Sequence, residues 1–250
     1  MKRWRYVLLV LCTAVISISG TYLMNYFMKS EENKQKYEDI SEIGFPETEA
    51  EHEEENDQQD VKQSEDDFDY QSLIAMNSDC VGWIQIPGTD INYPVVQAAD
   101  NEFYLTHNFN RETAACGAIF MDYRNDVDAK AEHLILYGHQ MKDNSMFKQL
   151  NGYKEEIFYK EHPNIKLYLH EQKYEYEITA VYVTDVANGG GYYNYLQQKM
   201  AGYQIYDTGK KVMETDELLS LSTCEYSSDN GRLIVQARRK GEMTDGKQII

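Results

Sequence analysis

Three residues in the C-terminal half have the types and spacing that nucleophilic catalysis needs. Cys224 ends the apolar segment 218–224, where the alternation of side chains along a strand puts its thiol on the more polar face. His139 follows a short apolar run and a glycine, and Arg232 opens the next apolar segment after Cys224. A cysteine attacks as its thiolate, which a neighbouring base or cation favours, and a guanidinium can stabilise the oxyanion formed at the attacked carbonyl. The three residues could therefore form a nucleophilic cysteine with a histidine and an arginine as partners; taken singly, Cys224 also fits a packed thiol and Arg232 a surface ion pair.

The other cysteines and histidines fit structural roles. The chain has four cysteines without a Cys-x-x-Cys pair, and Cys80 and Cys116 lie beside apolar strand segments, where a small buried thiol is expected. Cys12 lies in an N-terminal apolar run. The spacing of His133 and His139 suits neither a helical nor a strand pair of metal ligands, so we expect no metal site. We expect structural or surface positions for the remaining histidines, His52, His107, His162 and His170.

The candidate residues lie on a series of short strand-like segments separated by turn signals. Eight such segments follow one another, which predicts a β-barrel or a β-sandwich with few helices. The loop between Cys224 and Arg232 is short enough to return the second of their strands beside the first. The expected strands span residues 81–86, 91–97 (with Pro94 at an edge or bulge), 118–121, 133–137, 165–170, 174–185, 218–224 and 232–238, and the expected helices span residues 68–76, 145–159 and 193–203.

Taken together, these segments resemble a sortase, and more narrowly a class B sortase. The resemblance is carried by Tyr-Gly-His at 137–139, Leu-Ser-Thr-Cys-Glu-Tyr at 221–226 and Arg-Leu-Ile-Val-Gln-Ala at 232–237. It extends in order and spacing over roughly residues 67–240, and the helical interval before the cysteine strand also resembles class B. Supporting segments lie at 79–89, 91–97, 117–125 and 145–153.

The resemblance implies a closed eight-stranded β-barrel with peripheral helices and a cell-wall transpeptidase activity without a cofactor. In that scheme Cys224 attacks the carbonyl of the Thr in a C-terminal sorting signal and forms a thioacyl enzyme. His139 protonates the leaving amine and deprotonates the incoming one, while Arg232 holds the substrate and its oxyanion. An amine of a peptidoglycan precursor, or a pilin Lys, resolves the intermediate.

The resemblance also implies residues that bind the substrate. Asn101 and Leu105 match positions that line the signal groove of class B enzymes, and Ser222, Thr223 and Glu225 flank the cysteine. One departure is Cys116, where a small residue without a thiol would match the family better.

An uncharged N-terminal run predicts a membrane anchor. Residues 6–28 form a run of 23 residues without a charged side chain. As a helix rising about 1.5 Å per residue, the run would reach roughly 34 Å, enough to cross the hydrocarbon of a bilayer. A cleaved signal peptide is the alternative, but the apolar residues continue past the usual length of such a segment. Lys2, Arg3 and Arg5 precede the run, so we expect a single-pass protein of the cell membrane with its N-terminus in the cytoplasm and its catalytic domain outside.

The charge of the chain is concentrated in one stretch. The net charge of −18, from 24 Lys and Arg against 42 Asp and Glu, excludes a protein held on nucleic acid by phosphate neutralisation. Residues 31–70 alone carry 17 acidic and 3 basic side chains. So polar a segment cannot bury enough surface to offset the entropy of ordering, which predicts a flexible spacer. The expected organisation is a basic end at 1–5, an anchor at 6–28, a spacer at 29–66, a sortase catalytic domain at 67–240 and a tail at 241–250.

Two other functions are compatible with the same residues. A cysteine protease would hydrolyse the thioester instead of passing it to an amine. A non-catalytic anchored binding module would use Cys224 as a packed thiol only. The expected partners under the sortase reading are a surface protein bearing a sorting signal, an amine of peptidoglycan precursor or pilin, and the membrane, with no nucleic acid.

Overall fold

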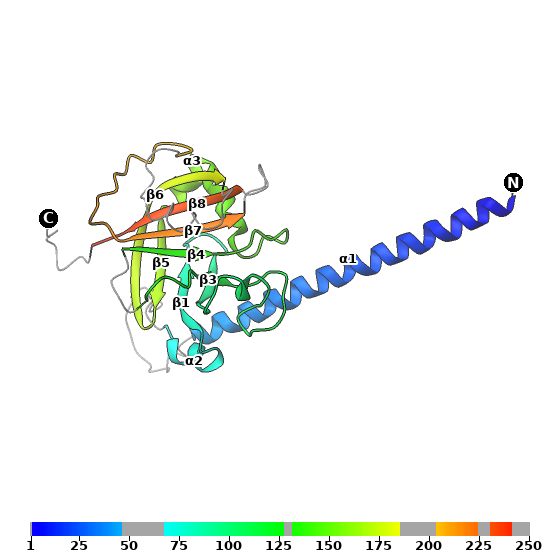
Figure 1. Cartoon of the computed structure of the whole chain (residues 1–250), viewed down its shortest axis with the longest axis horizontal. Coiled ribbons are helices and arrows are strands. Elements are labelled where there is room, and N and C mark those ends of the chain that lie inside the picture. Colours follow the sequence, from blue (N-terminus) through cyan, green and yellow to red (C-terminus); the bar gives the residue numbers. More distant parts are fainter. Residues whose placement is uncertain (1, 47–67, 128–131, 186–203, 225–230, 242–250) are drawn as a thin grey trace, which may run out of the picture. The chain divides into compact units, whose positions relative to one another are not determined.

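Eight strands close into a barrel in the computed structural model, which describes residues 2–46, 68–127, 132–185, 204–224 and 231–241 (Figure 1). The strands are β1 (Cys80–Gln85), β2 (Asn92–Val96), β3 (Ile119–Met121), β4 (His133–Tyr137), β5 (Asn164–Leu169), β6 (Gln172–Asp185), β7 (Leu218–Cys224) and β8 (Gly231–Arg239). Around the barrel they follow the order β1-β2-β3-β4-β7-β8-β6-β5. The closed eight-stranded barrel is confirmed, and the bounds of every expected strand agree to within two residues.

Two of the neighbouring pairs are parallel, β2 with β3 and β4 with β7, and the others are antiparallel. Pro94 pairs with Trp83 on one side, while the pairing with β3 begins only at Val95. A proline that donates no main-chain hydrogen bond is tolerated at such an edge position. The strands bury their apolar side chains in a common core, in which Ile135, Ala180, Tyr182 and Ile234 form one cluster.

Short helices lie before and between the strands. They are α2 (Tyr70–Met76), the 3₁₀ helices η1 (Phe103–Leu105) and η2 (Phe147–Lys154), and α3 (Glu156–Glu161). Asp69 caps α2 by accepting a hydrogen bond from the main-chain nitrogen of Ser72 at 2.9 Å. The single helix expected at 145–159 is instead two, because Glu155 is extended between them. The ring of Phe158 packs against Gly152 so closely that a Cβ there would lie 2.8 Å from it. The helix expected at 193–203 lies outside the described residues.

The N-terminal helix is longer than the expected anchor. The helix α1 (Lys2–Gly44) continues through residues 29–44, which we expected to begin a flexible spacer. Pairs such as Lys36 with Glu32, at 2.8 Å, join charged side chains one turn apart and support the helix. Contacts divide the chain into two units, Met1–Asp39 and Ile40–Ile250, so the last turn of α1 belongs to the unit that holds the barrel.

The end of α1 packs on the barrel through an aromatic cluster, which we define as Phe45, Phe68, Trp83 and Tyr168. The ring of Phe45 lies 5.5 Å from that of Trp83, 5.3 Å from that of Tyr168 and 5.3 Å from that of Phe68, measured between centroids. Trp83 is completely buried. Its indole nitrogen donates to Asn92 at 2.6 Å, and the Asn92 amide donates to the hydroxyl of Ser41 at 3.0 Å. Residues 40–46 therefore pack with the unit that holds the barrel.

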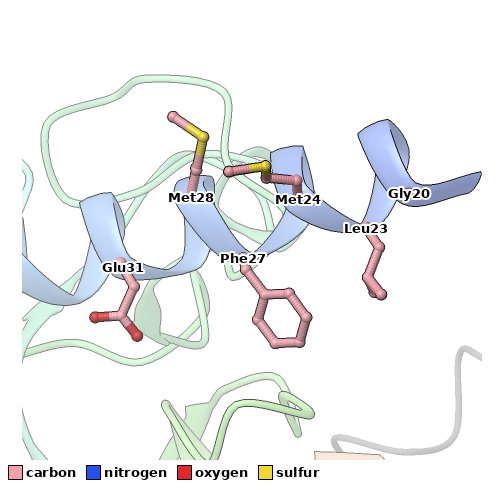
Figure 2. A pocket seen from close by; sticks show the side chains of 6 residues that line it. All are labelled: Gly20, Leu23, Met24, Phe27, Met28 and Glu31. Atoms are coloured by element: carbon pink, nitrogen blue, oxygen red, sulfur yellow. The ribbon is translucent and has the colours of Figure 1, made fainter. Parts of the chain in front are cut away.

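The apolar part of α1 is long enough to cross a membrane. Among the described residues it is the one helix that is both long and apolar enough for this. A depression open to the surroundings lies on this helix. Figure 2 shows the side chains of Met24 and Met28 on one side of the helix and those of Leu23 and Phe27 on the other. Because a single helix lines the depression, we attribute it to the uneven apolar surface of α1 and not to a ligand site. The lining residues are Gly20, Leu23, Met24, Phe27, Met28 and Glu31.

Candidate active site

Cys224 and Arg232 lie opposite each other on two adjacent strands. β7 and β8 are antiparallel, and their register pairs Cys224 with Arg232. Residues paired in this way project to the same face of a sheet with Cβ atoms about 5 Å apart. The guanidinium of Arg232 donates to the carbonyl oxygen of Gly231 at 2.9 Å. The predicted return of the chain after Cys224 is confirmed, and the thiol and the guanidinium share one face.

His139 reaches the thiol because its strand is the other neighbour of β7. β4 and β7 are parallel, their register pairs Tyr137 with Ser222, and the nitrogen of Gly138 donates to the oxygen of Ser222 at 3.2 Å. The chain leaves the sheet directly after Gly138, and the imidazole of His139 is hydrogen-bonded to the thiol of Cys224. The structure therefore brings together the three residues for which the sequence predicts catalysis.

The hydrogen bond between thiol and imidazole changes the pKa of both groups. It lowers the pKa of Cys224, against the opposing effect of burial, and the charge of Arg232 adds to the lowering. It raises the pKa of His139, again against burial, with a further contribution from the carbonyl of Leu105. At Cys80 burial has the larger effect: it outweighs a hydrogen bond with Gly82 and raises the pKa of the thiol to about 11. Of these two thiols, Cys224 is therefore the one whose surroundings favour the reactive thiolate.

A main-chain carbonyl orients the imidazole. The Nε2 atom of His139 lies 2.7 Å from the oxygen of Leu105. A carbonyl oxygen only accepts hydrogen bonds, so Nε2 carries the proton in this contact and donates it. Nδ1 is then the ring nitrogen left to exchange a proton with the thiol. The carbonyl of Leu105 does for His139 what a carboxylate or amide side chain does for the histidine of other nucleophilic enzymes.

A glycine allows the carbonyl and the imidazole to meet. Gly117 has a φ of +57°, and a Cβ at this position would lie 3.0 Å from the oxygen of Leu105 and 3.1 Å from Cδ2 of His139. It would also contact the oxygen of Tyr104. The side chain of Tyr104 anchors the same turn, since its hydroxyl donates to Asp79 at 2.8 Å. Sequence reasoning missed Gly117, although a glycine between Cys116 and an apolar strand was a signal that could have been followed.

Asn101 and Leu105 lie near this turn, but they are used differently. Leu105 has 40% of its surface exposed, while its carbonyl binds His139. The amide of Asn101 donates to the buried carboxylate of Asp122 at 2.9 Å, and its oxygen accepts from the nitrogen of Tyr123 at 3.0 Å. The structure therefore leaves the Leu105 side chain open to a ligand and gives Asn101 a structural hydrogen-bonding role.

Asp122 links Asn101 to the end of β4. Its carboxylate also accepts from the hydroxyl of Tyr137 at 2.8 Å and from two nitrogens of Arg124 at 2.7 and 2.8 Å. Burial raises the pKa of this carboxyl, but the hydrogen bonds from Arg124, Tyr137 and Asn101 outweigh it, and the pKa is lowered overall. The charged carboxylate thus connects Asn101 to Tyr137 at the end of β4, two residues before His139.

Ser222 and Thr223 are buried, each with 2% of its surface exposed. The expected polar face of β7 is therefore covered as well as its apolar face, and only at Cys224 does the strand become partly exposed. In this structure neither side chain lies open to a ligand, whereas the resemblance implied that both bind the substrate beside the cysteine. Glu225 lies outside the described residues.

The other described histidines form hydrogen bonds or ring contacts within the fold. His133 is buried against the hydroxyl of Ser220 at 2.8 Å. Ring nitrogens of His107 and His162 bond the main-chain oxygens of Phe103 and Pro87. His170 packs against the ring of Tyr70, and His52 lies outside the described residues. Within the part of the chain that the structure describes, no three His, Cys, Asp or Glu side chains gather as a metal site would require.

Comparisons with known proteins point to one family. The family model of the sortase domain matches residues 84–240. Sortase B of Listeria monocytogenes is 37% identical over 177 residues, which are 66% of this chain and 72% of that protein. Sortase B of Staphylococcus aureus is 30% identical over 249 residues, which are 95% of this chain and 97% of that protein. The solved structure of a Staphylococcus aureus sortase B–substrate complex superposes with a TM-score of 0.67 at 31% identity, over 85% of this chain and 98% of that one.

Proposed function

This chain belongs to the sortase family as a class B sortase, a cysteine transpeptidase of the cell wall, and we propose that it cleaves a C-terminal sorting signal after Thr and joins the protein to a peptidoglycan amine. The observation that carries the proposal is the hydrogen-bonded pair of Cys224 and His139 with Arg232 opposite the thiol. A relative of 31% identity has been solved as a complex with its substrate, which supports a peptide substrate here.

The first half of the reaction forms a thioacyl enzyme. The thiolate of Cys224 attacks the Thr carbonyl carbon, and the electron pair of the C=O bond moves to the oxygen. Arg232 stabilises the resulting oxyanion, since it shares a face with the thiol. The oxyanion collapses, the C–N bond breaks, and the protonated His139 gives its proton to the leaving amine. Because the pKa of His139 is raised, more of the imidazole is available as this acid than an isolated histidine would supply.

The second half transfers the acyl group to an amine. His139, now neutral, removes a proton from the incoming amine through Nδ1, while Nε2 stays bound to Leu105. The amine nitrogen attacks the thioester carbonyl, Arg232 again faces the oxyanion, and the C–S bond breaks. The lowered pKa of Cys224 makes its thiolate a good leaving group. The half-exposed side chain of Leu105 offers an apolar contact to the sorting signal beside the reacting groups.

We also propose that residues 6–28 of α1 cross the cell membrane, with the N-terminus in the cytoplasm and the catalytic domain outside. The apolar composition of the helix supports a span, and the basic residues before it support this orientation. The catalytic domain is proposed to include the last turn of α1, because Phe45 packs on Trp83.

A peptide screen tests the proposed reaction. The full chain in detergent micelles is offered a library of pentapeptide sorting signals, each with one of three additions: a peptidoglycan precursor with a free amine, a Lys-containing pilin peptide, or no amine. We expect an amide product with the precursor, identified by mass spectrometry, and cleavage after Thr. The matched variant Cys224→Ala should yield no cleavage.

Three outcomes would contradict the proposal in different ways. Hydrolysed peptide alone, with either amine, would indicate a cysteine protease. Amide formation with the Lys peptide only would replace the peptidoglycan acceptor by pilin. Binding of peptides without cleavage, equal in Cys224→Ala and in the parent chain, would indicate a non-catalytic binding module.

A further inference from the structure

The main chain of Cys224 is held by a side chain from the turn that follows β4. The carbonyl oxygen of Cys224 accepts a hydrogen bond from the amide nitrogen Nε2 of Gln140 at 3.0 Å. Gln140 directly follows His139 in the sequence. The residues that bear the thiol and the imidazole are therefore connected twice, once by their own side chains and once through Gln140.

The register of the strands explains why a side chain is needed there. The oxygen of Ser222 accepts from the nitrogen of Gly138, and carbonyls two residues apart in a strand point to the same side, so the carbonyl of Cys224 also points toward β4. Continuing a regular parallel ladder by two residues would make the main-chain nitrogen of Gln140 its donor. After Gly138 the main chain no longer runs beside β7. The carbonyl oxygen of His139 accepts from the nitrogen of Phe147 at 2.9 Å, and the main chain of Gln140 pairs with that of Met146 in an isolated β-bridge. The side-chain amide of Gln140 thus reaches back to the acceptor that its main chain would have met.

A second contact sets the direction of the amide. The ammonium group of Lys148 donates to Oε1 of Gln140 at 3.4 Å, on the side away from Cys224. Rotating the amide by half a turn would place Oε1 against the carbonyl of Cys224, where two acceptors meet, and would turn the NH₂ group toward the cation. The arrangement with Nε2 on Cys224 is the one that satisfies both neighbours.

We propose that Gln140 is a positioning residue, which fixes the main chain of Cys224 against His139 by supplying the ladder hydrogen bond that β4 cannot supply. The inference rests on the proposed function of Cys224 and His139. The turn after Gly138 releases His139 from the sheet so that its ring can face the thiol, and the amide of Gln140 closes the gap that this turn leaves. The amide of Gln140 binds the main-chain oxygen of Cys224 and not its thiol, so the proposed effect on the thiol is one of position.

The test compares isosteric variants of two glutamines in the full chain in detergent micelles. Gln140→Met keeps the length of the side chain and removes the donor. Gln149→Met is the matched control. Gln149 lies on η2, and its side-chain oxygen also binds a main-chain group, because it accepts from the nitrogen of Asp90. The pH dependence of alkylation by iodoacetamide, read at Cys224 by peptide mass spectrometry, reports the thiolate. Transfer of the best peptide of the screen to hydroxylamine gives kcat and KM.

For Gln140→Met we expect kcat to fall about tenfold, which corresponds to the loss of one hydrogen bond, with KM changed less than twofold. The pH midpoint of alkylation should rise, because the thiol is held less well against His139. Gln149→Met should change none of these. An unchanged midpoint and kcat in Gln140→Met would overturn the inference, and so would an equal loss in both variants.

Two further variants separate the possible failures. Gln140→Ala should reproduce the effect of Gln140→Met, because both variants remove the amide donor and the side chain is only half-buried. If both variants lost their folded structure, Gln140 would be structural and the inference would be wrong. If Cys224→Ala retained transfer activity, the proposed function would fail, whatever Gln140 does. Loss of activity in Cys224→Ala together with an unaffected Gln140→Met would remove the inference alone.

Discussion

The aromatic cluster and the active site are two regions of the same unit that are held together by different interactions. In the cluster, Phe45 packs against Trp83 and Tyr168 and fills its surroundings with apolar surface. At the active site, His139 and Cys224 are partly exposed, and hydrogen bonds to main-chain carbonyls hold them. Burial has no direction and tolerates small shifts, whereas a hydrogen bond weakens steeply with angle and distance. Mutations in the cluster should therefore cost stability and spare the rate, and mutations at the site should do the reverse.

The largest effect is expected for His139→Gln, which removes the acid and base. We expect kcat/KM to fall about 1000-fold with little change in the melting temperature. The hydrogen bond from His139 is the main cause that lowers the pKa of Cys224, so its loss should raise this pKa and move the alkylation midpoint to higher pH. In the parent chain the rate should fall in acid as the thiolate is protonated and in base as the imidazolium loses its proton. A variant whose alkylation midpoint did not move would show that the two side chains are independent.

Gly117→Ala should affect both properties, because it strains the main chain and displaces the imidazole. The positive φ and the contacts with Leu105 and His139 predict a loss of about 2 kcal/mol in the free energy of unfolding. The displaced ring should lower kcat about tenfold or more. Gly209→Ala is the matched control, since Gly209 also has a positive φ of 70° but nothing within 4 Å of its Cβ position. Equal loss of activity in the two variants would argue against a role of Gly117 at the site.

Phe45→Ala should cost about 2 kcal/mol in the free energy of unfolding, because it exposes part of Trp83 and Tyr168. The value of kcat should stay within twofold of the parent. Chemical denaturation of the full chain in detergent measures the first quantity and the peptide assay the second. Phe27→Ala serves as a control within the exposed apolar part of α1. A large loss of kcat in Phe45→Ala would break the distinction between the two regions.

Ser41→Ala should give the smallest effect and sharpen the comparison. It removes the acceptor of the Asn92 amide at the edge of the aromatic cluster, a single neutral hydrogen bond. We expect a loss of about 0.5–1 kcal/mol in the free energy of unfolding and no change in kcat. A loss larger than that of Phe45→Ala would mean that polar contacts, and not burial, hold this region.

The strands could be predicted from the sequence because their signals are local. Alternating apolar side chains bounded by glycines, prolines and polar turns gave bounds close to those of the structure, as for β4 and β7. The antiparallel return from Cys224 to Arg232 also follows from the short loop. The contact between Cys224 and His139 is different, because it depends on a parallel pairing across a long stretch of chain. It was expected from the resemblance, and strand patterns alone would not have given it.

The positions of Leu105, Gly117 and Gln140 could not be derived in the same way. Each acts through the main chain or on it: a carbonyl oxygen, a positive φ and an amide that binds a carbonyl. Such roles leave no pattern in residue types, since they depend on where the chain turns. The helical character of residues 29–44 was missed because the charge of this segment was read as repulsion, although part of it pairs within the helix, as Lys36 does with Glu32.

The order of the strands around the barrel has a consequence for the formation of the active site. β7 lies between β4 and β8, and β8 in turn closes the barrel against β6, so the strand with the nucleophile has both neighbours only when the last strand is in place. β7 and β8, which carry Cys224 and Arg232, are the last two strands of the barrel in the sequence. Cys224 is therefore placed beside both His139 and Arg232 only in the closed barrel, and a chain whose last two strands are unpaired lacks the site.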